Sequence, residues 1–263
     1  EERHIAGKLA AMAQETRPFA GGVMARGAPG AWFNRAHGAG LDGPVDPAEV
    51  DRLITFYEQR GIEPRMELCP FAHQTLVDAL AARGFVVRRF LIVLAREVDA
   101  AVPIDPPHPP PRGVVVERIR PGDADGIEAF GRLFVEGFEV RGEDRIAETM
   151  RAARHVVEAE GSIGVRAMLD GACVGVAAME LDGPLASLFG ACVTASARGR
   201  GIQQALLAWR LREAAASGAR VATIQSRPGI PTERNAARMG FTVAYNNVVL
   251  VRPGEGLVPA PGG

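Results

Sequence analysis

The stretch that most constrains this chain is a glycine- and arginine-rich segment between a strand and a helix. Residues 186–193 (ASLFGACV) form an apolar, strand-like run, and residues 198–201 (RGRG) follow it closely. Apolar residues then recur at i, i+3, i+4 and i+7, as on one face of a helix: Ile202, Ala205, Leu206 and Trp209. The chain must therefore fold so that a strand leads through a glycine loop into an amphipathic helix.

This segment has the chemistry of an anion site. Backbone N–H groups of such a loop can point at a bound anion, and the helix dipole favours negative charge at the first turn. Arg198 and Arg200 add cationic donors that suit phosphate oxygens. The segment has neither the G-x-G-x-x-G pattern of dinucleotide-binding loops nor the Gly-Lys-Ser/Thr of a P-loop. The residues predict another kind of phosphate or pyrophosphate site, with an ordinary strand–helix turn as the alternative.

The segment resembles the acetyl-CoA pyrophosphate loop of the GNAT superfamily of N-acyltransferases, whose pattern is Gln/Arg-x-x-Gly-x-Gly/Ala. Arg198, Gly201 and their spacing match, whereas Gln203 stands where that family usually has Gly or Ala. Asn235, on a later helix, is a candidate contact for the pantetheine arm, with a helix-surface asparagine as the alternative. The resemblance implies that acetyl-CoA is bound by these residues: Cys192, Val193, Arg198, Gly199, Arg200, Gly201, Ile202, Gln203 and Asn235.

The elements around the loop follow the GNAT order. Downstream, we expect strands at 220–225 and 242–251, separated by a helix at 232–239 that ends in Gly240-Phe241. Upstream, apolar patterns predict a strand, two helices and a hairpin: 114–118, 124–138, 143–158, and 162–169 joined to 172–180 by an Asp170-Gly171 turn. The resemblance thus covers about residues 113–252.

The first hundred residues repeat this order at a nearly constant offset. Gly84-Phe85 lies 156 residues before Gly240-Phe241, and Gly61, which ends a predicted helix, lies 157 before Gly218. The strand predicted at 31–37 keeps the same offset from 187–193. A constant offset across several elements predicts internal duplication.

The first copy lacks the chemistry of the second. Where the second has RGRG, residues 41–46 read LDGPVD, so Asp42 and Asp46 replace the arginines and Pro44 removes an N–H donor. Aspartates there would repel a pyrophosphate. We therefore expect one cofactor per chain, with the first lobe structural or forming a wall of the substrate site.

Two proline-rich segments complete the predicted domain plan. Six prolines in residues 103–112 favour a stiff polyproline II spacer, with a ligand for a partner domain as the alternative. The Pro/Gly-rich end is predicted to be disordered. The plan is a degenerate lobe at 1–100, a linker at 101–112, a catalytic acetyl-CoA domain at 113–252 and a tail at 253–263.

Composition excludes several other classes of protein. Lys and Arg number 30 against 31 Asp and Glu, so bulk charge favours neither nucleic acid nor an anionic membrane. Three cysteines form no disulfide framework and fit a reducing cytoplasm. The five histidines are scattered, so we expect no metal site, and no apolar run reaches membrane-spanning length.

Acyl transfer needs an oxyanion donor, a base for the amine and an acid for the leaving thiolate. The resemblance implies that the donor is the backbone N–H of Cys192 or Val193, and that Cys192 is a small buried side chain rather than a nucleophile. The family's frequent acid, a tyrosine four residues before Gly-Phe, is replaced here by Ala236.

Two other residues are therefore candidates for the proton transfers. Tyr245, on the strand after Gly240-Phe241, could be the acid or contact substrate, with a core or surface tyrosine as the alternative. Glu180, at the end of a strand, is the candidate base, acting directly or through water, with an exposed strand-end glutamate as the alternative.

The resulting expectation is an α/β fold with two GNAT-like lobes, each a mixed, mostly antiparallel twisted sheet flanked by helices. The expected function is N-acetyl transfer from acetyl-CoA to a small-molecule or peptide amine by direct attack, in a monomer or homodimer. Two alternatives stay open: a non-catalytic acyl-CoA-binding or interaction module, and a transferase that uses another acyl donor.

Overall fold

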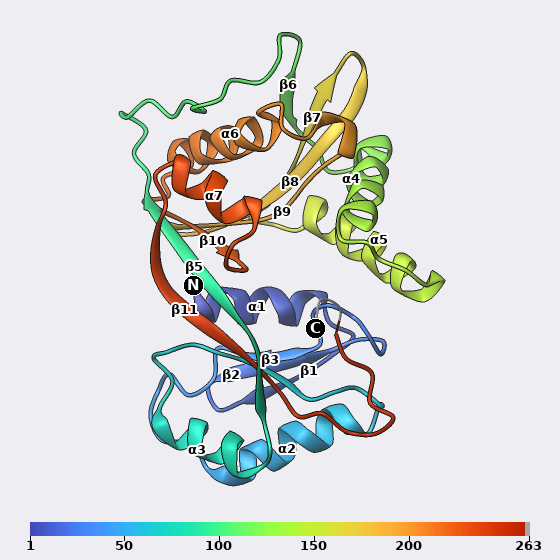
Figure 1. The fold of residues 1–263 in the computed structure, drawn as a ribbon, viewed down its shortest axis with the longest axis vertical. Helices are drawn as coiled ribbons and strands as arrows, with labels where there is room; N and C mark the ends of the chain where they lie inside the picture. The colour runs from blue at the N-terminus through green and yellow to red at the C-terminus, as the bar shows by residue number, and fades with distance from the viewer. Residues whose placement is uncertain (261–263) are drawn as a thin grey trace. The chain divides into compact units, whose positions relative to one another are not determined.

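The computed structural model describes residues 1–260 and has the expected α/β architecture (Figure 1). The helices are α1 (Glu2–Met12), α2 (Pro47–Glu58), α3 (Gln74–Ala82), α4 (Ala124–Gly137), α5 (Glu143–Glu158), η1 (Ala195–Ala197), α6 (Ile202–Ala216) and α7 (Pro231–Arg238). The strands are β1 (Glu15–Phe19), β2 (Gly22–Arg26), β3 (Arg35–His37), β4 (Arg65–Leu68), β5 (Val86–Glu97), β6 (Val115–Arg118), β7 (Ser162–Leu169), β8 (Ala172–Asp182), β9 (Leu185–Val193), β10 (Val221–Ser226) and β11 (Thr242–Val251).

The chain folds as two compact units whose boundaries fall inside strands. One unit contains Glu1–Ile92 together with the chain from Tyr245, and the other contains Val93–Ala244. Both boundaries lie within long strands, β5 and β11, whereas the sequence placed them near residues 100 and 252. The end of each repeat therefore belongs to the unit formed by the other repeat.

The first unit has the strand order β1-β2-β3-β4-β11. β3 pairs with β4 in parallel, and the second half of β11 pairs with β4 antiparallel, Val248 opposite Leu68. α2 begins where the sequence indicates, because the Asp46 carboxylate accepts the Ala48 N–H at 2.9 Å and Pro47 is the first helical residue. Its apolar face, including the fully buried Leu53 and Tyr57, forms the core with α3.

Residues 1–30, to which the sequence analysis assigned no element, contribute α1, β1 and β2. β1 is only five residues long and contains Pro18. Its sequence also lacks the alternation of apolar and polar residues by which a strand is recognised. Because β1 lies at the edge of the sheet, the missing N–H of Pro18 costs little.

The second unit has the order β5-β10-β9-β8-β7-β6, with β6 to β9 antiparallel and β9 parallel to β10. The predicted Asp170-Gly171 turn is present, with both residues at positive φ (51° and 79°). α4 and α5 cover one face of this sheet and α6 the other (Figure 1). The element order β9-α6-β10-α7-β11 repeats β3-α2-β4-α3-β5, as the constant offset predicted.

The proline-rich linker and the tail are both packed. Ile104 is buried, and the His108 N–H donates to the Gln204 side chain at 3.0 Å, so the linker lies against the start of α6. In the segment expected to be disordered, Val258 pairs with Ile62 through hydrogen bonds to Gly61 and Glu63. This backbone pairing attaches the segment to the chain after α2, and residues 261–263 lie outside the described part.

Candidate functional site

The predicted phosphate loop joins β9 to α6 and keeps its first-turn donors free of side-chain caps. Gly199 and Gly201 have φ of 73° and 77°, a conformation in which any residue with a Cβ is strained. Gly201 precedes α6, which has no side-chain cap and no acidic residue in its first turn. The N-terminal N–H groups of a helix without a cap are available to an anion.

Arg198 and Arg200 are both exposed beside this loop. The Arg198 Nε donates to the carbonyl of Val193 at 3.2 Å, which holds the side chain close to the end of β9. The linker closes the loop on another side, since a Cβ at Gly201 would lie 2.7 Å from the His108 carbonyl oxygen. The loop thus combines cations and backbone donors at one helix terminus.

Gln203, the departure from the family pattern, is turned toward α7. Its carbonyl accepts from the Asn235 amide at 2.5 Å, and its amide donates to Thr232 at 3.4 Å. Gln204 donates to the same Asn235 side chain at 3.2 Å. Asn235 therefore ties α7 to the first turn of α6, which leaves the Gln203 backbone N–H as the part of that residue suited to a phosphate.

Above the loop, β9 separates from β10. Their parallel pairing runs from Leu185 opposite Val221 to Leu188 opposite Ile224, while β9 continues to Val193. On its other edge β9 stays paired with β8, except where Gly190 and Ala191 together face Ala177 in a bulge. The last five residues of β9 thus present an edge that β10 does not cover.

The register decides which N–H groups face that edge. The Thr194 N–H donates to the Val174 carbonyl on the β8 side at 3.0 Å. Backbone groups alternate along a strand, so the Cys192 N–H also faces β8 and the Val193 N–H faces the uncovered edge. Of the two residues predicted to offer a backbone N–H, only Val193 therefore directs it toward the uncovered edge.

Aromatic side chains of α4 and of its C-cap residue, Phe138, lie over the bulge on one face of the sheet. Phe130, Phe134 and Phe138 form a series with ring centroids 6.0 and 4.4 Å apart. A Cβ at Gly190 would come within 3.0 Å of the Phe134 ring. Phe138, at the open end of the series, is 53% exposed and so offers an aromatic surface beside the bulge.

Cys192 lies against Gly137 of α4 and is buried. Burial raises the pKa of its thiol to about 12, so the side chain is a neutral thiol at physiological pH. A neutral buried thiol is a poor nucleophile. This environment favours the interpretation of Cys192 as a small packing residue.

Glu180 is half-buried in a row of polar residues that crosses the sheet. It lies opposite Ser162 on β7 and opposite Ser187 on β9, and Ser187 in turn lies opposite Thr223 on β10. The hydroxyl oxygens of Ser187 and Thr223 are 3.3 Å apart. The row lies on the face covered by α4 and α5, and it crosses β9 at Ser187, two residues before the part of β9 that β10 leaves uncovered.

Tyr245, the candidate acid, belongs to the first unit. Its hydroxyl donates to the Glu2 carboxylate at 2.7 Å, and its ring lies 5.3 Å from that of Phe71. Burial and the neighbouring Glu2 charge raise the pKa of the phenol well above its ordinary value. Asn247 and His37 also contact Glu2, at 3.1 and 3.0 Å. The acid role of Tyr245 stays a prediction. Its hydrogen bond to Glu2, the first residue of α1, also ties β11 to that helix.

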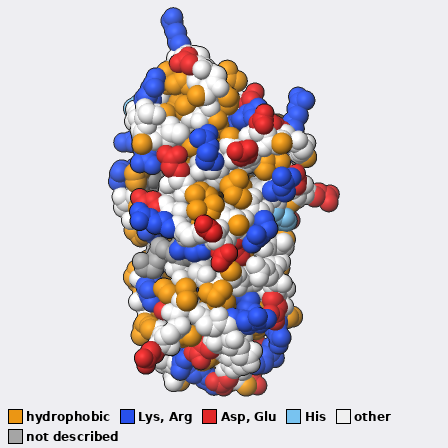
Figure 2. Space-filling view, turned by 90° about the vertical axis from the view of Figure 1, so that its right-hand side faces the viewer, with side chains coloured by type: hydrophobic (Ala, Val, Ile, Leu, Met, Phe, Trp, Pro, Cys, Tyr) orange, Lys and Arg blue, Asp and Glu red, His pale blue; other side chains and the backbone are white. Residues whose placement is uncertain are grey.

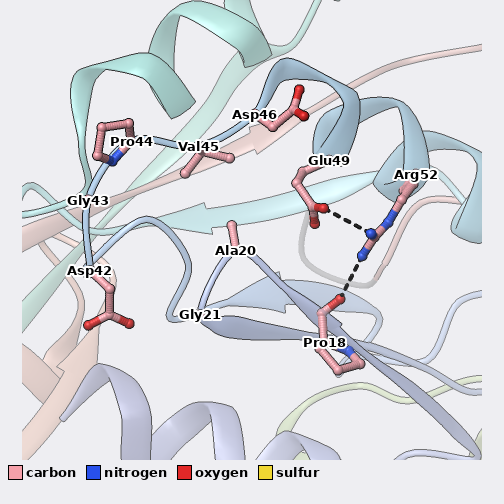
Figure 3. A pocket seen from close by; sticks show the side chains of 10 residues that line it. All are labelled: Pro18, Ala20, Gly21, Asp42, Gly43, Pro44, Val45, Asp46, Glu49 and Arg52. Carbon is pink, nitrogen blue, oxygen red and sulfur yellow. Dashed lines mark hydrogen bonds and ion pairs between the residues drawn. The ribbon is translucent and has the colours of Figure 1, made fainter.

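The matching loop of the first unit has the opposite chemistry (Figure 3). A pocket of about 460 Å³ lies there, and Asp42, Asp46 and Glu49 line it. Glu49 pairs with Arg52 at 2.9 Å, and Asp46 caps α2. The N-terminus of α2 is thus already occupied by the Asp46 carboxylate.

Other kinds of site are not evident among residues 1–260. No group of three or more His, Cys, Asp and Glu side chains in that part of the chain could hold a metal ion. No helix there is both long and apolar enough to cross a membrane. Figure 2 shows basic and acidic side chains intermixed over the face in view, in keeping with a net charge of −1.

Solved structures share this arrangement. A GCN5-related N-acetyltransferase from Kribbella flavida is similar over 96% of this chain and 96% of its own, with 21% identity and a TM-score of 0.71. The chain has the GNAT fold. A tandem GNAT protein from the clavulanic acid biosynthesis pathway is similar over 89% of this chain and 78% of its own, with 16% identity and a TM-score of 0.60.

Similarity of the whole chain to known proteins is found in structure rather than in sequence. No protein-family model matches the sequence, and no curated protein matches it. The resemblance drawn from the loop and the order of elements is confirmed, and the similarity to a tandem protein agrees with the predicted duplication.

The bond between Tyr245 and Glu2 makes a prediction about stability. Burial raises the pKa of the Glu2 carboxyl, but bonds from His37, Asn247 and Tyr245 outweigh it, so the pKa lies below its ordinary 4.5. Tyr245→Phe should lower the free energy of unfolding by about 1 kcal/mol near pH 7. The loss should shrink as pH falls through the lowered folded-state pKa, because the bond to an ionised acceptor is the stronger one.

Denaturant titrations from pH 7 down to about pH 3, which extends below the ordinary carboxyl pKa, would measure this difference. Tyr57→Phe is the matched control, because the Tyr57 hydroxyl donates to the neutral Ala25 carbonyl at 3.1 Å and its loss should not depend on pH. A Tyr245→Phe protein with unchanged stability and a kcat reduced about 10²-fold would instead support the acid role.

The contrast between the two loops predicts the binding stoichiometry. Calorimetric titration of the intact chain with CoA should give one site per chain, because carboxylates occupy the corresponding helix start in the first unit. Two sites per chain would contradict this account of the first unit.

Proposed function

We propose that the second unit is an acyltransferase that passes the acetyl group of acetyl-CoA to an amine by direct attack. The observation that carries the proposal is the uncapped glycine loop at the end of a strand whose edge is uncovered. The loop suits a pyrophosphate, and the edge offers N–H and C=O groups to an amide-containing arm that runs beside it. Pantetheine is such an arm, so the donor set fits CoA.

In this proposal, the residues of the loop divide the work of holding the donor. The N–H groups of residues 199–203 and the guanidinium groups of Arg198 and Arg200 bind the pyrophosphate. Val193 offers an N–H to the arm at the edge of β9. Asn235 acts through Gln203 and Gln204, since its contacts fix the first turn of α6 rather than reach past it.

The reaction forms one C–N bond and breaks one C–S bond. The amine nitrogen attacks the thioester carbonyl, the carbonyl oxygen gains negative charge, and the CoA thiolate then leaves. Glu180 takes the amine proton, directly or through water, and that proton is then passed through water to the leaving thiolate. Cys192 takes no covalent part, because its thiol is buried and neutral. We propose that the acceptor is a small-molecule or peptide amine entering beside α4.

A non-catalytic acyl-CoA-binding module is the second candidate. Ala236 stands where the family often has its acid, and the contacts of Tyr245 described above are with residues of the first unit. Release of free thiol from acetyl-CoA, measured with a panel of primary amines, separates the two candidates. Turnover supports the enzyme, whereas tight acetyl-CoA binding without turnover on any amine supports the module.

The loop arginines give the direct test of donor binding. Arg198→Ala should weaken CoA binding roughly tenfold or more, since a bond to a charged partner contributes about 1.5–3 kcal/mol. Arg212→Ala, at an exposed position of α6, is the matched control and should bind CoA like the wild type. Calorimetry at low and moderate salt measures both. Equal affinity in the wild type, Arg198→Ala and an Arg198→Ala, Arg200→Ala double variant would rule out this site.

A further inference from the structure

Arg210 is a buried cation in the middle of α6, the helix that follows the phosphate loop. It is only 3% exposed. Its Nε donates to the Leu206 carbonyl at 3.1 Å, and its Nη1 donates to the carbonyls of Ala178 at 2.9 Å and Phe189 at 3.3 Å. The last two belong to neighbouring strands, β8 and β9, so one nitrogen joins the helix to both strands.

These two carbonyls lie directly at the bulge. Ala178 is the last residue of β8 in register with β9 before the irregularity, and its partner is Phe189. On β9 the next residues are Gly190 and Ala191, which together face Ala177. Gly190 has φ of 62°, which a glycine adopts without strain. Arg210 therefore contacts the peptide that begins the bulge.

The contact fixes the direction of the Gly190 N–H. A single nitrogen can reach both carbonyls only if both point into the space between β8 and β9, as in a hydrogen-bonded antiparallel pair. The Phe189 carbonyl and the Gly190 N–H share one trans peptide unit, so they point in opposite directions. The Gly190 N–H accordingly points away from β8, toward the edge of β9 that β10 leaves uncovered.

Packing alone does not account for this arginine. Burial lowers its pKa to about 9, and no carboxylate among residues 1–260 offsets that cost. Around it α6 buries apolar residues such as Leu207, Leu211 and Ala214. An apolar side chain of similar size would suit such a site, because replacing buried charge by well-packed apolar groups is often neutral or stabilising.

We propose that Arg210 is a positioning residue for acyl transfer, which holds the Phe189 carbonyl so that the Gly190 N–H faces the thioester carbonyl of the donor. This inference rests on the proposed function. As the amine nitrogen bonds to the carbonyl carbon, the carbonyl oxygen gains negative charge, which an N–H already aimed at it stabilises. The guanidinium also polarises the shared peptide and so strengthens that donor. The charge disappears when the C–S bond breaks and the thiolate leaves.

The test compares Arg210→Met, which removes both bonds, with Arg210→Lys, which keeps the charge and a donor. Arg212→Met is the control, since Arg212 is exposed on the same helix. Three measurements are made on the full-length chain: the Kd of CoA by calorimetry, the infrared stretch of acetyl-CoA labelled with ¹³C at the thioester carbonyl, and amine-dependent thiol release. The infrared measurement needs no acceptor and reports on the carbonyl itself.

In the wild type, the stretch of the bound carbonyl should lie below its value in solution. Arg210→Met should return it toward the solution value, reduce thiol release about 10²-fold and leave the Kd of CoA within about threefold. Arg210→Lys should give a carbonyl stretch and a rate of thiol release between those of Arg210→Met and the wild type, and Arg212→Met should match the wild type. If Arg210→Met does not fold, Arg210→Lys carries the test, because a single ammonium should give an intermediate stretch at unchanged CoA affinity.

Other results would overturn the inference in distinguishable ways. Equal stretches for acetyl-CoA bound to the wild type and to the folded Arg210 variant would remove the positioning role and leave the proposed function standing. A parallel loss of CoA affinity and thiol release would assign Arg210 to the stability of α6 only. A wild type that binds no acetyl-CoA would remove the proposed function and this inference together.

Discussion

The separation of β9 from β10 after Leu188 is the constraint on which the second unit depends. Two parallel strands that diverge leave backbone N–H and C=O groups along one edge, and such groups must find partners. The bulge at Gly190 adds to this edge, and the loop that follows Val193 adds cations and the donors of an uncapped helix. An extended ligand with an anionic end satisfies all three features at once.

The first unit shows what the same arrangement becomes without that chemistry. Its parallel pair, β3 and β4, is followed by β11 in the sheet, and His37 at the end of β3 lies 3.0 Å from Glu2. Asp46 caps the helix that in the second unit has no cap. In the first unit a carboxylate of the chain itself thus accepts from the first turn of the helix, whereas the first turn of α6 has no such side-chain partner.

Local features of the site could be predicted from the sequence, and long-range ones could not. The RGRG loop, the Asp46 cap and the Asp170-Gly171 turn are set by neighbouring residues, and the repeat offset revealed the duplication. It was not predictable that the end of each repeat belongs to the unit formed by the other repeat. β5 and β11 are both apolar, and no neighbouring residue indicates which sheet each strand completes. For the same reason the sequence did not indicate that Tyr245 belongs to the first unit. Arg210 carried one unused signal: it lies four residues after Leu206, within the apolar stripe of α6.

The central claim is that a donor thioester lies along the uncovered edge of β9, with its phosphates on the loop before α6. A crystal structure of the chain with acetyl-CoA measures this most directly. The account predicts a pyrophosphate bonded to the N–H groups of residues 199–203 and a thioester oxygen within hydrogen-bond distance of the Gly190 N–H. Acetyl-CoA bound in the first unit, or bound in the second with its thioester away from β9, would contradict the account.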